Sequence, residues 1–363
     1  MIVTVTPNPS LDVALHVDEL RRGEVLRATA ERHDAGGKGL NVSRALAGGG
    51  VPTRAILPLG GSAGADLLAL LRGDHGVEPV EVPLTGATRS NVGIVEPDGT
   101  LTKVNAAGPV LSADEVDALR AAILAAAGSA SWVVLAGSLP KGLAPDFYAS
   151  LIGPLQALGA RVALDSSGAA FDLGLAAGPD LVKPNVHELA EVLGRDLRTL
   201  GDLADAAAEL RARGPRTVLA SAGPDGAVLV DADGPVHGEP PPIVPASSVG
   251  AGDAMLAGYL AATELAGGPD GDADPAAALT AALAWGAGAA SLPGSRMPRP
   301  ADLHPEGVRI HPAVDRDRPL EEVAVAPTPT TAALAAAPTV TTGPPASSHH
   351  TAQSTPITEG PRR

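Results

Sequence analysis

The chain has 363 residues, of which 45% are hydrophobic and only 2% aromatic, so its core must be built from Ala, Val and Leu. This length allows one large α/β domain with an appended lid, or two ordinary domains. The formal net charge of −15 argues against nucleic acid and anionic membrane as partners, because Lys and Arg drive that binding. The absence of cysteine excludes disulfides, thiolate metal sites and thiol nucleophiles.

No targeting or membrane segment is expected. The first residues, MIVTVTPNPSLD, lack a basic region and contain Asp12, which is unlike a secretory signal, so we expect a cytoplasmic protein. The longest nearly apolar stretch, from Ala276 to Leu292, is short and Gly-rich and is followed by Pro293, so it does not predict a membrane span.

Apolar, β-branched runs alternate along the chain with Ala-rich segments of helical period. Strands are expected at Ile2–Thr6, Thr53–Pro58, Trp132–Ala136, Arg161–Asp165, Leu181–Lys183 and Thr217–Ser221. Helices are expected at Leu40–Ala47, Ala63–Arg72, Ala113–Ala127, Asp146–Leu158, Asp202–Arg213 and Ala251–Leu265. This alternation predicts an α/β fold: a doubly wound, mostly parallel sheet with helices on both faces.

Two stretches depart from the alternation. One is residues 18–33, and the other is the pair Thr88–Glu96 and Thr100–Asn105, joined by Pro97-Asp98-Gly99. Such a turn between two runs of alternating Val, Ile, Thr and polar residues predicts a hairpin. We therefore expect a small β-sheet lid formed by residues of about 13–34 and 86–106.

The C-terminal region differs in composition. From Ala324 onward the charged residues are Glu359, Arg362 and Arg363 alone, and Ala, Thr, Pro and Ser dominate. Such a segment buries too little apolar surface to offset its ordering entropy. We expect a folded domain over residues 1–305 and a disordered Ala/Pro/Thr-rich tail over 306–363, with a partner-binding tail as the alternative.

The first candidate site is the Gly-rich turn Val249-Gly250-Ala251-Gly252-Asp253, which opens a helical stretch. Such a turn directs free N–H groups and the positive end of the helix dipole at one spot, which suits an anion. Asp253 in the first turn is a candidate base for a hydroxyl group, and the alternative is a carboxylate that only caps the helix. A dinucleotide-binding fingerprint fits poorly, because Met255 stands where its third Gly is required.

The second candidate site is Ala35-Gly36-Gly37-Lys38-Gly39-Leu40-Asn41, which also leads into a helix. It is not a P-loop, because Gly39 follows Lys38 where Ser or Thr is required. Close backbone approach to a polyhydroxy ligand, with hydrogen bonds from Asn41 and a charge from Lys38, is what these residues permit. An ordinary Gly-rich turn is the alternative.

The third candidate site is Lys183-Pro184-Asn185-Val186-His187-Glu188, where a strand ends and a helix begins. Asn185 and Glu188 are suited to a hydrated Mg²⁺, which needs few protein ligands. The alternative is structural, since Pro at this boundary and Glu in a first helical turn are common on those grounds alone. His187 is expected to be a solvated helix residue.

The fourth candidate site is basic and lies on the predicted lid. Arg89 and Asn91 are two apart and share one face of their strand, and Lys103 lies on the return strand. The guanidinium of Arg suits a phosphate monoester because it can bind two oxygens at once. Charges of this kind can also simply block edge pairing.

Taken in order, these segments resemble the PfkB branch of the ribokinase-like carbohydrate kinases, and within it most closely the 1-phosphofructokinases. The resemblance spans roughly Met1 to Pro305 and rests on five motifs: Thr6-Pro7-Asn8-Pro9-Ser10-Leu11-Asp12, Gly36-Gly37-Lys38-Gly39-Leu40-Asn41-Val42-Ser43-Arg44-Ala45, Gly137-Ser138-Leu139-Pro140, Lys183-Pro184-Asn185-Val186-His187-Glu188 and Gly250-Ala251-Gly252-Asp253. It implies the ribokinase-like form of the α/β fold and, through the lid, a possible homodimer.

The resemblance also implies roles for individual residues. It makes Asp253 the catalytic base and the N–H groups of Gly250, Ala251 and Gly252 the anion hole. The implied sugar-phosphate ligands are Asp12, Gly37, Lys38, Asn41, Arg89, Ser138, Lys103 and Arg27. The implied ATP-binding residues are Lys183, Asn185, Ser221, Gly223, Gly226 and, on the helix around Trp285, Ala289. Asn185 and Glu188 would organise Mg²⁺.

The implied reaction is transfer of the ATP γ-phosphoryl group to the C6 hydroxyl of fructose 1-phosphate, which gives fructose 1,6-bisphosphate and ADP. Tagatose 6-phosphate or fructose 6-phosphate as acceptor is the alternative within the family. A non-catalytic sugar-phosphate-binding regulator is the alternative of another class. A nicotinamide-dependent oxidoreductase is suggested by the doubly wound pattern alone.

Overall fold

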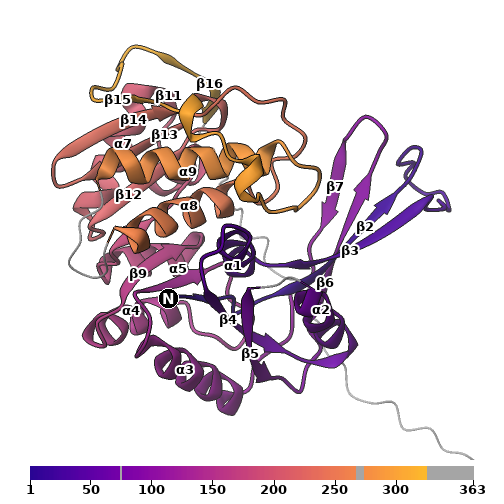
Figure 1. Cartoon of the computed structure of the whole chain (residues 1–363). Coiled ribbons are helices and arrows are strands. Elements are labelled where there is room, and N and C mark those ends of the chain that lie inside the picture. Colours follow the sequence, from indigo (N-terminus) through magenta and orange to yellow (C-terminus); the bar gives the residue numbers. More distant parts are fainter. Residues whose placement is uncertain (74–75, 267–273, 325–363) are drawn as a thin grey trace, which may run out of the picture. The chain divides into compact units, whose positions relative to one another are not determined.

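The structure, a computed structural model of the chain, describes residues 1–73, 76–266 and 274–324 (Figure 1). A ten-stranded sheet runs through the described part. Its order is β15 (Arg309–His311), β14 (Gly234–Glu239), β13 (Ala227–Asp231), β12 (Thr217–Ser221), β10 (Leu181–Val182), β9 (Arg161–Asp165), β8 (Trp132–Ala136), β1 (Ile2–Val5), β4 (Thr53–Leu59) and β5 (Val77–Pro83).

The sheet is parallel from β12 to β5 and antiparallel from β12 to β15. From β1 the chain first moves outward to β4 and β5, and then returns to the other side of β1 to form β8. The strand order therefore reverses beside β1. In open α/β sheets, ligands bind outside the carboxyl ends of the strands at such a reversal.

Helices cover both faces of the sheet because successive strand residues point to opposite faces. Val133 and Leu135 belong to one core, and Trp132 and Val134 to the other. The first face carries α3 (Ala113–Ala127), α4 (Phe147–Ala157), α5 (Gly168–Ala176), α6 (Val186–Leu193) and α7 (Leu200–Ala212). The second carries α1 (Lys38–Gly48), α2 (Gly61–Gly73), α8 (Ala251–Leu265) and α9 (Pro275–Ala290).

A separate four-stranded sheet forms the lid, in the order β3 (Ala30–Gly36), β2 (Ser10–His16), β6 (Arg89–Val95) and β7 (Leu101–Val104). The β6–β7 pair is the predicted hairpin, and Gly99 takes a φ of 91° in its turn. β2 pairs in parallel with β6 and antiparallel with β3. Asp12 is thereby placed opposite Asn91, which the hairpin alone did not predict.

The predicted α/β architecture and the lid are confirmed. The predicted bounds are found for the strands β8, β9 and β12 and for the helices α3 and α8. Every other strand and helix that was predicted begins and ends within two residues of its predicted bounds. Within the described residues, no helix is long and apolar enough to cross a membrane.

The predicted boundary of the disordered tail is wrong for residues 306–324. This stretch contains part of a short 3₁₀ turn (Pro305–Gly307), the edge strand β15 and β16 (Pro319–Ala324), which pairs with β11 (Leu197–Thr199). The physical reason is that Ile310 pairs within the sheet and Leu320 is 4% exposed, so the segment buries apolar surface after all. Residues 325–363 lie outside the described part of the chain.

Candidate active site

Asp253 lies in the first turn of α8 and is 7% exposed. Gly250, the residue at the helix N-cap, has a φ of 80°, a conformation that favours glycine, and it leaves the first N–H groups of α8 without a side-chain cap. The Nδ2 atom of Asn41 donates a hydrogen bond of 2.8 Å to Oδ2 of Asp253. The expected base thus stands beside the expected anion hole of Gly250, Ala251 and Gly252.

The start of α1 is held against the carboxyl end of β1. Gly37, the N-cap residue, has a φ of 128°, and a Cβ atom on Gly39 would lie 2.7 Å from the carbonyl oxygen of Val5. Only glycine allows this approach, which brings Asn41 next to Asp253. The Oδ1 atom of Asn41 is buried and has no hydrogen-bond partner among the described residues. The Gly-rich segment is therefore more than an ordinary turn.

A network of alternating charges joins the carboxyl ends of β9 and β10 to the starts of α1 and α6. Asp165, which is 1% exposed, accepts a hydrogen bond of 2.7 Å from Nζ of Lys38, and its Oδ2 lies 3.2 Å from Nζ of Lys183. Lys38 also lies 3.5 Å from Oε1 of Glu188. Burial opposes ionisation of Asp165, but the two lysines outweigh it and lower the pKa of this carboxyl.

The same network shifts the proton affinity of the expected base. Burial, followed by the negative charge of Asp165, raises the pKa of Asp253 to about 6, while Lys183 and the hydrogen bond from Asn41 oppose the shift. A carboxyl with a pKa close to neutrality accepts a proton more readily than an exposed one and is still ionised at pH 7. This distinguishes Asp253 from an ordinary first-turn carboxylate.

Asn185 and Glu188 cap the start of α6, which was the structural alternative to a Mg²⁺ site. Oδ1 of Asn185 accepts from the Glu188 amide at 2.8 Å, and Oε2 of Glu188 accepts from the Asn185 amide at 2.9 Å, which together form a capping box at the start of α6. The cap therefore occupies the oxygen through which Asn185 was expected to bind Mg²⁺. Oε1 of Glu188 is the oxygen that faces Lys38.

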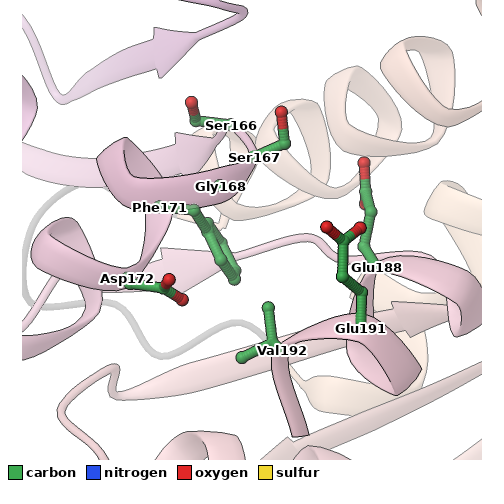
Figure 2. A pocket seen from close by; sticks show the side chains of 8 residues that line it. All are labelled: Ser166, Ser167, Gly168, Phe171, Asp172, Glu188, Glu191 and Val192. Carbon is green, nitrogen blue, oxygen red and sulfur yellow. The ribbon is translucent and has the colours of Figure 1, made fainter. Parts of the chain in front are cut away.

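A cavity of about 190 Å³ opens between α5 and α6 beside Glu188 (Figure 2). Its lining residues are Ser166, Ser167, Gly168, Phe171, Asp172, Glu188, Glu191 and Val192. None of these lining residues is basic, and carboxylate and hydroxyl oxygens repel anions and suit a hard cation. The cavity is thus poorly matched to phosphate, which fits the basic side of the network better.

On the lid, Asp12 is held by its neighbours. Its Oδ1 accepts hydrogen bonds of 2.7 Å from Ser10 and 2.9 Å from Asn91. A Cβ atom on Gly36 would lie 2.5 Å from Oδ2 of Asp12, so the carboxylate rests on the Gly-rich segment that leads into α1. The lid residue expected to bind sugar hydroxyls is therefore brought to the start of α1.

Arg89 anchors the loops around the lid. Its guanidinium donates to the carbonyl oxygen of Asn8 at 3.0 Å and to that of Ala106 at 2.9 Å. Burial is the main cause of a lowered Arg89 pKa, which Asp12 opposes. Asn8 in turn donates to Oγ of Ser138 at 3.3 Å, and its own Oδ1 is buried without a partner among the described residues. Arg89 and Ser138, far apart in sequence, thus meet through Asn8.

The residues expected at the nucleotide lie on the other side of the network. The amide of Ser221, at the end of β12, donates to the carbonyl oxygen of Pro184 at 3.0 Å. Ser221 also forms a parallel β-bridge with Asn185, and the 3₁₀ turn that follows, Gly223–Asp225, ends at Gly226. Ser221 is therefore brought next to Pro184 and Asn185, and the turn with Gly223 and Gly226 follows it directly in the chain.

Three expected site residues are not brought into the site. Arg27 and Lys103 are exposed, and Arg27 lies in the loop beyond His16, at the end of β2 remote from Ser10. Ala289 is 0% exposed and packs in the core with Trp285, so its side chain cannot contact a nucleotide in this conformation. Helix α9 is apolar around its circumference, and for that reason its face toward the sheet is not distinguishable in the sequence.

Asp165 and Asn8 are central to the site although neither was among the expected site residues. A signal for Asp165 was present, since it ends a parallel strand in which every residue after Arg161 is buried, and a carboxylate there is costly unless it is paired. Asn8 follows β1 in the same way. Their partners, Lys38 and Lys183 for one and Ser138 for the other, come from distant segments and could not be read from the sequence.

Known proteins resemble this chain in sequence and in fold. The family described as pfkB family carbohydrate kinase matches residues 8–301. The 1-phosphofructokinase of Rhodobacter capsulatus is 41% identical over 307 residues, covering 83% of this chain and 94% of that protein. The ATP-dependent 6-phosphofructokinase isozyme 2 of Escherichia coli strain K12 is 38% identical over 258 residues, covering 70% of this chain and 83% of that protein.

Among solved structures, the phosphofructokinase-2 from Escherichia coli in complex with substrates and products is similar, with a TM-score of 0.77 and 34% sequence identity. The alignment covers 83% of this chain and 96% of that one. The family match over residues 8–301 includes the two Gly-rich segments and the strand ends that carry the charge network. The chain belongs to the pfkB family of carbohydrate kinases.

Proposed function

We propose that this chain transfers the γ-phosphoryl group of ATP to the C6 hydroxyl of fructose 1-phosphate, giving fructose 1,6-bisphosphate and ADP. The observation that carries the proposal is the pair Asn41 and Asp253: a buried carboxylate, with a pKa raised to about 6, fixed by an amide at the N-terminus of α8. Fructose 1-phosphate is preferred over fructose 6-phosphate as the acceptor because the chain is 41% identical to the relative named 1-phosphofructokinase and 38% identical to the one named 6-phosphofructokinase isozyme 2.

In the proposed reaction, the carboxylate of Asp253 accepts the proton of the C6 hydroxyl as its oxygen attacks the γ-phosphorus. General-base assistance of this kind contributes about 10²–10⁴ in rate. The N–H groups of Gly250, Ala251 and Gly252, with the helix dipole, stabilise the charge on the transferred group. Lys38 and Lys183 add positive charge beside it, and Asp165 holds both lysines in position.

The acceptor sugar lies between the lid and the start of α1 in this proposal. Buried oxygens without a protein partner among the described residues, Oδ1 of Asn41 and Oδ1 of Asn8, are left for sugar hydroxyls, because buried polar atoms are rarely unpaired. Asp12 and the Gly37 backbone add further contacts. Arg89, Ser138 and Lys38 bind the sugar's own phosphate.

ATP is bound in this proposal by Lys183, Asn185 and the turn formed by Ser221, Gly223 and Gly226. Mg²⁺, when bound, neutralises phosphate charge. The donor set suits it: Oε1 of Glu188 faces the network and the neighbouring cavity is lined by further carboxylate and hydroxyl oxygens. Asn185 would contribute less than Glu188, because its Oδ1 already accepts from the Glu188 amide and only the second lone pair of that oxygen is left.

The lid also suits a second copy of the chain. Val13 pairs with Val92, Leu15 with Ile94 and Val92 with Val104, so these apolar side chains share the face of the lid opposite Asp12. Val104 is 62% exposed. An apolar sheet face of this kind favours association, and we propose a homodimer that buries it. We further expect the enzyme to act in the cytoplasm.

A coupled ADP-release assay tests the acceptor. Fructose 1-phosphate, fructose 6-phosphate, tagatose 6-phosphate and unphosphorylated fructose are compared at equal concentrations, and kcat/KM is expected to be highest for the first. Unphosphorylated fructose is expected to be at least about tenfold worse, since it leaves the phosphate site unpaired. A higher kcat/KM for fructose 6-phosphate or tagatose 6-phosphate would show that this sugar phosphate, and not fructose 1-phosphate, is the acceptor. Tight sugar-phosphate binding without turnover of any of them would favour a regulator instead.

A further inference from the structure

The C-terminal strap, which we define as residues 309–321, lies beyond the region of family similarity that ends at residue 301. It begins with β15, the edge strand beside β14, and ends in β16, in the yellow part of the ribbon (Figure 1). Because Leu320 is 4% exposed and the amide of Leu200 donates to the carbonyl oxygen of Arg318 at 2.9 Å, the strap is fixed to the body of the domain.

The strap holds one buried carboxylate by both oxygens. Asp225, which is 1% exposed, accepts from the guanidinium of Arg318 through Oδ1 at 3.2 Å and from the amide of Glu321 through Oδ2 at 2.6 Å. The ring of His237 lies 2.9 Å from the carbonyl oxygen of the same residue and donates to it. Asp225 is thus held by hydrogen bonds from the strap and from β14, although it belongs to neither element.

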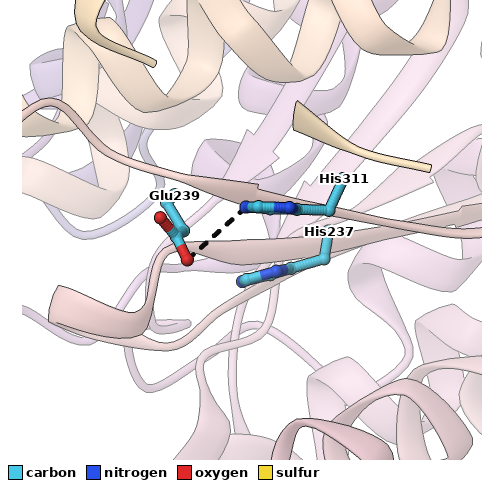
Figure 3. Close-up of side chains that lie close together, drawn as sticks. All are labelled: His237, Glu239 and His311. Atoms are coloured by element: carbon cyan, nitrogen blue, oxygen red, sulfur yellow. Dashed lines mark ion pairs between the residues drawn. The ribbon is translucent and has the colours of Figure 1, made fainter. Parts of the chain in front are cut away.

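Glu239 fixes Arg318 in the position from which it reaches Asp225. Its Oε1 accepts from Arg318, and its Oε2 accepts from Nε of Arg309 at 2.8 Å. Figure 3 shows Glu239 with His237 and His311, whose rings are stacked with centroids 5.4 Å apart. These three residues are not suited to a metal ion, because the two guanidinium groups already occupy the carboxylate and repel a cation.

Asp225 belongs to the turn that is assigned to the nucleotide. It lies between Gly223 and Gly226, and the amide of Ala222 closes the turn on the carbonyl oxygen of Gly226 at 2.8 Å. A Cβ atom on Gly226 would lie 1.9 Å from the carbonyl oxygen of Gly238, so the back of the turn rests on β14. The front, with Gly223, is exposed. Only the front is available to a ligand.

We propose that Asp225 and Arg318 are positioning residues for the nucleotide: the strap locks the Ser221–Gly226 turn from behind in the orientation that binds ATP. The proposal rests on the proposed function, which assigns this turn to ATP. Groups that orient binding residues from behind can matter as much as the contacts themselves: at metal sites, loss of such a group typically weakens binding by about 10-fold to 100-fold. Neither residue touches the reacting atoms.

The test compares Arg318→Ala with Arg316→Ala as a matched control. Arg316 is also a strap arginine, but its guanidinium pairs with the exposed Asp205 at 2.6 Å, away from the turn. Arg318→Ala is expected to raise the KM for ATP about tenfold, and to leave kcat and the KM for the sugar phosphate within about twofold. Arg316→Ala is expected to change none of these constants. Arg318→Lys is expected to give an intermediate KM for ATP, because an ammonium cannot bridge Asp225 and Glu239 as a fork can.

Two further measurements keep the outcome decisive. If Arg318→Ala does not fold, Asp225→Asn replaces it, because the amide keeps the shape and still accepts from Glu321, and the same rise in the KM for ATP is expected. Binding of ATP alone, measured by calorimetry, separates the two proposals: weaker binding to the variants supports positioning even if the wild type phosphorylates none of the sugars. A lower melting temperature with unchanged ATP affinity would overturn the positioning role, as would a wild type that binds no ATP.

Discussion

Asn41 and Asp253, which are 212 positions apart in the sequence, are joined by a hydrogen bond of 2.8 Å between the amide Nδ2 and the carboxylate Oδ2. The contact restrains the Asp253 carboxylate and links the first turn of α1 to that of α8. Oδ1 of Asn41 is buried and has no hydrogen-bond partner among the described residues, so it is available to accept from a bound ligand. The predictions below follow from this contact and from the charges around it.

Asp253→Asn is expected to lower kcat by about 10²–10⁴ with little change in ATP affinity, because the amide keeps the shape of the carboxylate but accepts no proton. Steady-state kinetics and ATP calorimetry measure the two quantities. Asp202→Asn is the matched control, since Asp202 is a first-turn carboxylate of α7 that only completes a capping box. Equal losses of kcat in both variants would reduce Asp253 to a helix cap.

The activity is expected to depend on pH through the same group. Only the ionised form of Asp253 accepts a proton, so kcat/KM should rise with pH, with a midpoint near the pKa of about 6, and level off above it. Initial rates between pH 5 and 8 at constant ionic strength measure this profile. Asp165→Asn should move the midpoint to lower pH, because it removes a neighbouring negative charge and leaves Lys38 and Lys183 unneutralised. An unmoved midpoint in this variant would argue against the charge network.

Stability should change in the opposite sense to activity. The folded-state pKa of Asp253, about 6, lies above the ordinary value of 3.8, so the stabilisation from holding this proton is complete below 3.8 and is lost as the pH rises through 6. The ionised carboxylate then costs about 1–3 kcal/mol. Asp253→Asn should therefore unfold at a higher temperature than the wild type at pH 8, and the difference should vanish near pH 4. A variant less stable than the wild type at pH 8 would contradict the assigned shift.

Arg89→Ala is expected to raise the KM for the sugar phosphate far more than that for ATP, by about tenfold or more. In the proposed site Arg89 binds the sugar's phosphate, and in the structure its guanidinium also holds the loops at Asn8 and Ala106. Arg54→Ala serves as the control, because Arg54 pairs with the exposed Glu78 on β4 and β5. A similar rise in both KM values would remove Arg89 from the sugar site.

The lid face should control association. Val104→Asp is expected to convert a dimer to a monomer, because a carboxylate buried in an apolar interface without a partner is costly. Light scattering coupled to size exclusion gives the molar mass. Val244→Asp is the control, since Val244 is 86% exposed but does not belong to the lid. If the wild type is monomeric at micromolar concentration, or if both variants dissociate alike, the lid is not the interface.

Much of the site could be predicted because its elements have strong local signals. Buried parallel strands such as Trp132–Ala136 and helices such as Ala251–Leu265 are specified by their own periodicity, and both were predicted with the bounds that the structure shows. Gly250 and Gly37 mark helix starts that need φ values of 80° and 128°, and this requirement is local as well. The sequence alone thus determined the alternating fold and the two Gly-rich segments.

The tertiary structure alone decided which charges meet. Asp165 pairs with Lys38 and Lys183, which come from segments before and after it in the chain. The Asn185 oxygen that was expected to bind a metal ion accepts a hydrogen bond in the capping box instead. The strap at Arg318 was mistaken for part of a disordered tail, because its stability comes from Asp225 and Glu239, far back in the chain. A helix or strand can be predicted because neighbouring residues in the sequence specify it. Which buried charges pair depends on distances between remote segments, and these distances exist only after the sheet has formed.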